Sequence, residues 1–287
     1  MDYRKPFRVK PGHKLRLNKL DPAYTGKQGS EDNAKEEAQH HLKELARQQT
    51  LLYAEHKHSV LIVLQAMDAG GKDGTIRHVM SGVNPQGVRV HSFKVPSAGE
   101  LAHDFLWRYA RELPARGEIG IFNRSHYEEV LVVRVHPETL DRQRLPPEAM
   151  AKGVWRRRFR EINDWERHLS GNGFKIVKLM LNLSREEQRL RFLKRLDRPD
   201  KNWKFSASDI AERQYWDGYQ RAYSKMLSHT STPWAPWYVI PADHKWFARI
   251  CVSAIIAQAL MDINPQYPQL SGAAKRELAA ARKTLEA

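Results

Sequence analysis

A small-residue loop at residues 67–75 carries the side chains best suited to chemistry. It reads Met-Asp-Ala-Gly-Gly-Lys-Asp-Gly-Thr, and it joins an apolar, β-branched run to a helix-capable segment. A buried strand, a loop ending in Gly-Lys and a helix together predict a phosphate-binding loop. Glycines let backbone N–H groups approach an anion, while the helix N-terminus and Lys72 add positive charge. The simpler alternative is an ordinary glycine-rich turn with a surface lysine.

Two departures from the usual pattern of such loops indicate what kind of phosphate is bound. In place of G-x-x-x-x-G-K-[ST], the chain has Ala66 at the first glycine and Asp73 at the last position. Asp68 and Asp73 would repel phosphate in the absence of a cation. With Mg²⁺ the sign reverses, because carboxylate and phosphate oxygens share the ion. The loop is therefore predicted to hold a metal-bridged, highly charged phosphate ligand. The predicted phosphate-contacting residues are Ala69, Gly70, Gly71, Lys72, Asp73, Gly74 and Thr75.

A second group of polar residues follows the apolar run at 118–122. Asn123 stands where phosphate-loop enzymes usually carry an acid that helps to hold the metal, and it offers an oxygen without charge. Arg124 has the geometry to bind a phosphate through two hydrogen bonds, the alternative being an Asx-type turn with a solvated arginine. Glu128 and Glu129 are candidates to bind metal or orient an acceptor, the alternative being that one of them only decorates the next helix.

The elements that must position these residues form an alternating pattern. Five short apolar runs, separated by helix-capable segments, predict an α/β fold with a doubly wound parallel sheet of about five strands. Ligands of such sheets bind at the carboxyl ends of the strands, where the phosphate loop lies. Ser30 is expected to cap a helix that runs to about His56. The apolar runs cover residues 59–66, 88–93, 118–122, 174–182 and 236–240.

An arginine-rich segment at about 184–227 is predicted to form a lid. Ser184 opens it with a capping-box pattern, a basic polar loop follows, and a long second helix is expected from Ser206 to about Leu227. Lids of phosphoryl-transfer enzymes bring basic side chains onto phosphate and exclude water, whereas the alternative is a surface helical hairpin. The expected organisation is an N-terminal arm (1–30), a main domain that contains the lid (31–263) and a C-terminal tail (264–287).

Composition limits the class of partner. The net charge of +15, from 48 Lys+Arg against 33 Asp+Glu, implies a polyanion: nucleic acid, an anionic membrane or a phosphate polymer. The single cysteine, Cys251, lies in an apolar segment and is expected in the core. One cysteine excludes an intramolecular disulfide framework and suits a reducing cytosol, so a cytoplasmic location is expected. The chain lacks both an uninterrupted apolar run of about 18 residues and an N-terminal apolar signal core.

Four stretches of the chain resemble the type-2 polyphosphate kinases, within a resemblance that covers about residues 30–265. Many members of that family carry Asp at the strand end, and Trp and Asn within the second motif. This chain has Asn123, His126 and Glu128 there, which resembles the subgroup often called class III, whose members accept both nucleoside mono- and diphosphates. The four stretches are Met67–Thr75, Phe122–Glu128, Trp203–Phe205 and Ala235–Ile240.

The resemblance implies a P-loop kinase-like fold and a reversible reaction. The terminal phosphoryl group of inorganic polyphosphate would pass to AMP and ADP, giving ADP and ATP, with Mg²⁺ or Mn²⁺. Lys72 would hold the transferring phosphates, Arg124 would bind the nucleotide phosphate, and Glu128 or Glu129 would place a second metal or the acceptor. The implied metal ligands are Asp68, Asp73 and Asn123, Asp68 being also a candidate to position the attacking oxygen. The implied lid residues are Arg191, Arg195, Lys201 and Lys204. Family members are commonly oligomers, so a homo-oligomer, tetramer or dimer, is expected.

Two rival functions remain open at this point. One is an ATP-dependent small-molecule kinase of the same fold, against which the excess positive charge and the lid arginines argue mildly. The other is a nucleic-acid-binding protein with a vestigial phosphate loop. No helix-turn-helix, RNP-type or zinc-ligand pattern supports the second rival, so neither nucleic acid nor a membrane is expected as a partner.

Overall fold

One parallel sheet forms the centre of the molecule. The computed structural model describes residues 2–150, 153–204 and 206–287, apart from the side chain of Lys204. Among these residues, five parallel strands are hydrogen-bonded into a single sheet. Each strand lies within one residue of the apolar run that predicts it, so the expected α/β class is confirmed. The strands are β1 (Ser59–Ala66), β2 (Val88–Ser92), β3 (Ile119–Asn123), β4 (Phe174–Asn182) and β5 (Trp237–Pro241).

The strand order brings the two polar groups of the sequence together. It is β2-β3-β1-β4-β5, which places β1 in the middle. Every residue of β1 is buried, with Ile62 facing one core and Val63 the other, as expected of a strand covered on both faces. Leu64 of β1 pairs with Asn123 of β3, so both strands end at the same edge. The phosphate loop therefore starts beside Arg124.

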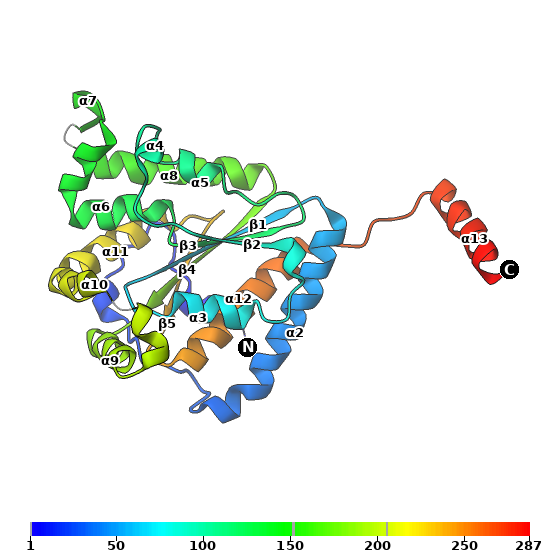
Figure 1. Ribbon diagram of the computed structural model, residues 1–287, viewed down its shortest axis with the longest axis horizontal. Helices are drawn as coiled ribbons and strands as arrows, with labels where there is room; N and C mark the ends of the chain where they lie inside the picture. The colour runs from blue at the N-terminus through cyan, green and yellow to red at the C-terminus, as the bar shows by residue number, and fades with distance from the viewer. Residues whose placement is uncertain (1, 151–152, 205) are drawn as a thin grey trace.

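Helices cover both faces of this sheet (Figure 1). One core lies beneath α2 (Glu31–Glu55), α3 (Lys72–Val79) and α12 (Lys245–Ile263). The other core lies beneath α8 (Val154–Gly171) and α11 (Trp216–Thr230). Apolar side chains on both faces of one sheet require such a double cover, so the predicted doubly wound arrangement is confirmed.

Helix α12 is apolar around most of its circumference. It is the one helix in the described chain that is long and apolar enough to cross a membrane, judged by length and composition only. It packs against α2 and α3, and 67% of its most apolar window is buried inside the protein, which fits a core helix. Cys251 lies on this helix and is fully buried, as predicted.

Helix α2 begins and ends where the sequence predicts. The Ser30 side chain accepts a hydrogen bond from the backbone N–H of Asn33 at 3.3 Å, which satisfies one of the free donors of the first turn. At the other end, His56 follows Glu55 in the left-handed conformation, with φ of 58°. Both boundaries are thus set by local signals rather than by packing.

The segment predicted to form a lid, at about 184–227, contains more breaks than the sequence predicts. Its first helix starts as expected, because the Ser184 hydroxyl accepts from the N–H of Glu187 at 3.0 Å. The prediction of one long second helix is wrong: Ser206 makes no side-chain cap, and the chain forms a short helix and a 3-10 turn before α11. The lid elements are α9 (Arg185–Leu196), η5 (Pro199–Lys204), α10 (Ala207–Glu212) and η6 (Arg213–Tyr215).

The two ends of the chain behave differently. Most of the N-terminal arm lies along the body, where the N–H of Val9 donates to the carbonyl of Trp237 in the edge strand at 2.8 Å. The C-terminal helix α13 instead stands apart from the body in Figure 1 and has no buried residue. The remaining elements are α1 (Arg4–Phe7), η1 (Leu17–Lys19), η2 (Pro85–Gly87), α4 (Ala98–Leu101), α5 (Trp107–Ala110), η3 (His126–Val130), α6 (Val132–Val135), η4 (Pro137–Gln143), α7 (Pro147–Met150) and α13 (Gly272–Glu286).

The packing of α12 leads to a stability prediction. Ile256→Ala removes buried methyl groups from the core beneath α2 and α12, so the free energy of unfolding should fall by about 2–5 kcal/mol. Chemical denaturation would measure it. Val95→Ala is the control, because that side chain is 79% exposed and its loss should cost less than about 0.5 kcal/mol. Equal changes in the two variants would contradict the assignment of α12 to the core.

Candidate active site

The phosphate loop makes a tight turn that only glycine allows at its centre. The N–H of Gly70 donates to the carbonyl of Met67 at 3.0 Å. A Cβ atom on Gly70 would lie 2.5 Å from the Cβ of Ala66 and 2.8 Å from the Met67 carbonyl oxygen, closer than real Cβ contacts. Gly71 then takes a φ of 95° and caps α3, which starts at Lys72. The backbone therefore has the close-packed path required to surround an anion.

Lys72 reaches back into the loop that precedes it. Its ammonium donates to the carbonyl of Ala66 at 2.9 Å. The residue keeps some exposed surface, but the ammonium end is enclosed. Burial lowers the Lys72 pKa, and the guanidinium of Arg124 lowers it further, while the carboxylate of Asp68 opposes both effects. The charge is thus held at the base of the loop, where a bound phosphate group would meet it.

A large basic cleft opens above this loop. Its volume is about 1040 Å³, and it is lined by the phosphate loop, the ends of β2 and β3, the lid and the start of α12. Eleven basic side chains and five aspartates face it, which gives the cleft a strong positive field. All seven predicted phosphate-contacting residues, 69–75, line it. The basic residues are Lys72, Arg77, Lys94, Arg124, Arg191, Lys194, Arg195, Arg198, Lys201, Lys245 and Arg249.

Asp68 and Arg124 pair across the edge of the sheet. The Arg124 guanidinium lies 3.1 Å from the Asp68 carboxylate, and both side chains keep contact with solvent. Arg124 has a left-handed backbone with φ of 63°, and its N–H donates to the Leu64 carbonyl at 3.2 Å. A non-glycine residue seldom adopts this conformation, so the turn that aims the guanidinium is held by its surroundings. The structure brings these two predicted site residues together.

Asn123 supports Asp73 through its amide nitrogen. Its amide nitrogen donates to the Asp73 carboxylate at 2.9 Å and lies 3.3 Å from the Ser92 hydroxyl. Asn123 orients Asp73 through its amide nitrogen, while its amide oxygen takes no part in these two contacts, so its role as a metal ligand stays a prediction. The carboxylates of Asp68 and Asp73 both face the cleft and supply hard oxygen donors.

The donor set fits a Mg²⁺ ion that is shared with its ligand. The described residues contain no group of three or more His, Cys, Asp or Glu that could hold a metal alone. Mg²⁺ usually takes only one or two carboxylates from a protein and completes its shell with water and phosphate oxygens. Asp68 and Asp73 provide two such carboxylates at the cleft.

The two adjacent glutamates have different surroundings. The Glu128 carboxylate accepts a hydrogen bond from the Gln65 amide at 2.8 Å. Like Asp68, it opposes the lowering of the Lys72 pKa that burial causes. Glu129 is buried, and its carboxylate lies 2.8 Å from the Arg158 guanidinium. Burial raises the Glu129 pKa, and Arg158 opposes that effect. Neither glutamate is among the residues that line the cleft, and Glu129 is already paired with Arg158, a contact that gives it a structural role; its catalytic role stays a prediction.

Three of the predicted lid residues, Arg191, Arg195 and Lys201, line the cleft, and Arg191 is also an anchor. Arg191 is buried and donates to the Ala69 carbonyl at 3.2 Å and to the Glu187 carboxylate at 2.8 Å, which ties α9 to the phosphate loop. Arg195 forms an ion pair with Asp209 at 3.4 Å, and Lys201 lines the cleft from η5. The Lys204 side chain lies outside the described part of the structure.

Six of the basic residues that line the cleft were not predicted from the sequence. Two of them come from α12, a helix that reads as apolar core. Their spacing of four residues places both on one side of its first turns, a signal that was present in the sequence. Only the strand order of the folded sheet brings this side of α12 to the phosphate loop. The missed residues are Arg77, Lys94, Lys194, Arg198, Lys245 and Arg249.

Comparisons with known proteins agree with this geometry. The model of the polyphosphate kinase 2 (PPK2) family matches residues 28–268. An ADP-polyphosphate phosphotransferase of Rhodopseudomonas palustris is 51% identical over 98% of each chain. An AMP/ADP-polyphosphate phosphotransferase of Meiothermus ruber is 47% identical over 95% of this chain and 98% of the relative. The crystal structure of polyphosphate kinase 2 from Arthrobacter aurescens TC1 superposes with a TM-score of 0.87, at 40% identity, over 98% of this chain and 97% of that chain.

The turn at Gly70 yields a binding prediction. Gly70→Ala forces the loop open because the new methyl group collides with Ala66, so binding of tripolyphosphate with Mg²⁺ should weaken about tenfold or more. Titration calorimetry would measure it. Gly82→Ala is the matched control, since a Cβ atom there meets nothing within 4 Å. Unchanged tripolyphosphate affinity in folded Gly70→Ala protein would contradict the role of this turn.

Proposed function

Because the chain belongs to the polyphosphate kinase 2 family, we propose that it transfers the terminal phosphoryl group of inorganic polyphosphate to AMP and to ADP. The products are ADP and ATP, and the reaction is reversible. The named relatives are polyphosphate phosphotransferases, and this chain is a phosphotransferase of the same family. The two relatives differ in acceptor, since one is named for ADP alone and the other for AMP and ADP.

The basic cleft above an acidic phosphate loop is the observation that carries this proposal. A polyphosphate chain has roughly one negative charge per phosphate, so its binding needs many cations and no sequence readout, as in non-specific binding of nucleic acid. Eleven basic side chains in one cleft meet that need. A small phosphorylated donor such as ATP would use fewer of them. The supported donor is therefore the polymer.

The residues of the loop and the lid have roles that follow from phosphoryl transfer. That reaction depends mostly on positioning and on neutralising charge. Lys72 and the loop N–H groups would hold the transferred phosphoryl group, and Arg124 would hold the acceptor phosphate. Mg²⁺ or Mn²⁺, held by Asp68 and Asp73, would supply positive charge between neighbouring phosphate oxygens. Arg195 and Lys201 would bind the more distant part of the donor chain and help to exclude water.

Acceptance of both AMP and ADP is supported by the residues after β3. The Meiothermus ruber relative is named for both acceptors, and this chain shares the Asn123 and Glu128 pattern of the dual-acceptor subgroup that it resembles. Glu128 sits beside Gln65 and close enough to Lys72 to alter its pKa. The negative charge of the Glu128 carboxylate would therefore act on an acceptor phosphate bound at Arg124.

We also propose a cytoplasmic homo-oligomer that acts without nucleic acid or a membrane. The single buried cysteine suits a reducing compartment. The apolar side chains Leu278 and Leu285 on α13 are exposed, and they offer a surface for self-association.

A phosphoryl-transfer assay tests the proposed function. Long-chain polyphosphate with Mg²⁺ should give ADP from AMP and ATP from ADP, followed by chromatography of the nucleotides. Lys72→Ala should reduce turnover at least about a hundredfold in folded protein, because it removes the ammonium that neutralises the transferring phosphate. Transfer from ATP to another acceptor, with none from polyphosphate, would favour the ATP-dependent small-molecule kinase instead.

The carboxylate of Glu128 should affect the two acceptors unequally. AMP has one phosphate group fewer than ADP, so its attacking oxygen must be held closer to Arg124, where Glu128 sets the local charge. Glu128→Asn should lower kcat/KM about tenfold for AMP and less for ADP. Glu148→Asn, on the exposed helix α7, is the control. Equal losses with both acceptors would remove Glu128 from acceptor choice.

A further inference from the structure

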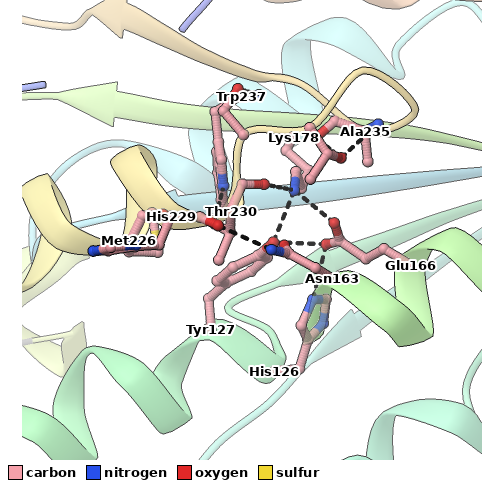
Figure 2. A network of polar contacts seen from close by, with 12 residues as sticks. His126, Tyr127, Asn163, Glu166, Lys178, Met226, His229, Thr230, Ala235 and Trp237 are labelled. Atoms are coloured by element: carbon pink, nitrogen blue, oxygen red, sulfur yellow. Dashed lines mark hydrogen bonds and ion pairs between the residues drawn. The ribbon is translucent and has the colours of Figure 1, made fainter. Parts of the chain in front are cut away.

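A buried ion pair lies behind the strand end that carries Arg124. Lys178 of β4 and Glu166 of α8 are both fully buried, and the ammonium lies 2.6 Å from the carboxylate (Figure 2). Neither residue lines the basic cleft. The pair therefore takes no direct part in binding phosphate, and the proposed function leaves it unexplained.

The pair is completed by residues from η3 and α11. The Lys178 ammonium also donates to the Tyr127 hydroxyl at 2.8 Å and to the Thr230 carbonyl at 2.7 Å, so all three of its protons are used. The Tyr127 hydroxyl donates to Glu166 at 2.7 Å, and a ring nitrogen of His126 lies 3.2 Å from the same carboxylate oxygen. Figure 2 shows these side chains converging from four elements on one point. The donors of Lys178 and the Tyr127 hydroxyl are all used, and a buried network of this kind rigidifies the groups that it joins.

Stability alone is a poor explanation for this arrangement. Taking two charges out of water costs several kcal/mol per ion, and replacing a buried pair by apolar residues is often neutral or stabilising. What a buried pair with three directed hydrogen bonds adds is orientation of the groups bonded to it. Two of those groups, His126 and Tyr127, belong to η3, the segment that follows Arg124 at the end of β3.

The oriented segment needs outside support. It forms the five-residue 3-10 helix η3, whose hydrogen bonds are weaker than those of an α-helix. The inward anchors His126 and Tyr127 stand between one residue that contacts the phosphate loop and one that contacts the end of β1. Before them, Arg124 contacts Asp68 at 3.1 Å, and after them, Glu128 contacts Gln65 at 2.8 Å. A shift of the anchors would therefore move both charged groups.

We propose that Tyr127, Glu166 and Lys178 are positioning residues for phosphoryl transfer. They hold η3 in place, and through it they fix Arg124 and Glu128 against the phosphate loop. This proposal rests on the proposed function for its kinetic consequence. Its geometric part concerns the η3 segment itself and is measurable without turnover.

Tyr127→Phe is the direct test, because it deletes one hydroxyl and adds nothing. With polyphosphate and ADP, kcat/KM for ADP should fall about tenfold or more, whereas KM for polyphosphate should stay within about twofold. Hydrogen exchange should speed up in the amides of residues 123–131. Ser253→Ala is the matched control: it removes a buried hydroxyl on α12 that donates to the Ile250 carbonyl at 3.0 Å, in the core on the other face of the sheet. It should lower the melting temperature to a similar extent and leave the kinetics and this exchange unchanged.

A second variant separates positioning from stability. Lys178→Met combined with Glu166→Leu removes both charges together and so leaves no unpaired buried charge; it should show the same loss in kcat/KM for ADP as Tyr127→Phe. Wild-type kinetics in either variant would overturn the proposal. If the parent itself transfers nothing from polyphosphate, the proposed function fails. Exchange in residues 123–131 and calorimetric ADP affinity then decide the positioning claim, and unchanged values in Tyr127→Phe would refute it.

Discussion

The loop between β1 and α3 must hold a polyanion although two of its own side chains, Asp68 and Asp73, are carboxylates. The rest of the site follows from this conflict of charge. Lys72 is enclosed at the base of the loop, and Arg124 lies against Asp68. Basic side chains from the lid and from α12 then surround the opening. We propose that a divalent cation would resolve the remaining repulsion, because carboxylate and phosphate oxygens can share such an ion.

Holding these charges at fixed positions requires support from elements that touch no ligand. Arg191 bonds the backbone of the phosphate loop and links it to α9 of the lid. On the other side of the sheet, the buried pair of Lys178 and Glu166 anchors η3 through Tyr127. The pairing of Leu64 with Asn123 brings the ends of β1 and β3, and with them the two segments that these supports hold, to the same edge of the sheet. Catalysis by positioning depends on such rigid surroundings.

The strands and the phosphate loop were predictable because their signals are local. Apolar runs bounded by polar residues mark strands that are buried on both faces, and the path of the loop depends on glycines within it. The different fates of Glu128 and Glu129 were not predictable, because the turn of η3 sends adjacent side chains to opposite environments and Arg158 comes from a distant helix. The lining residue Arg249 was missed for the same reason: only the folded sheet brings α12 to the loop. The break between α10 and α11 has no equally clear mark in the sequence.

The most direct test of this account is the affinity for long-chain polyphosphate with Mg²⁺ and with a chelator, at matched ionic strength. Chelation should weaken binding about tenfold or more, because Asp68 and Asp73 then repel the chain. In the double variant Asp68→Asn with Asp73→Asn, the affinity without metal should rise and the dependence on Mg²⁺ should shrink. Equal affinity of the parent protein with and without Mg²⁺ would contradict the central claim that this acidic loop binds its donor through a shared cation.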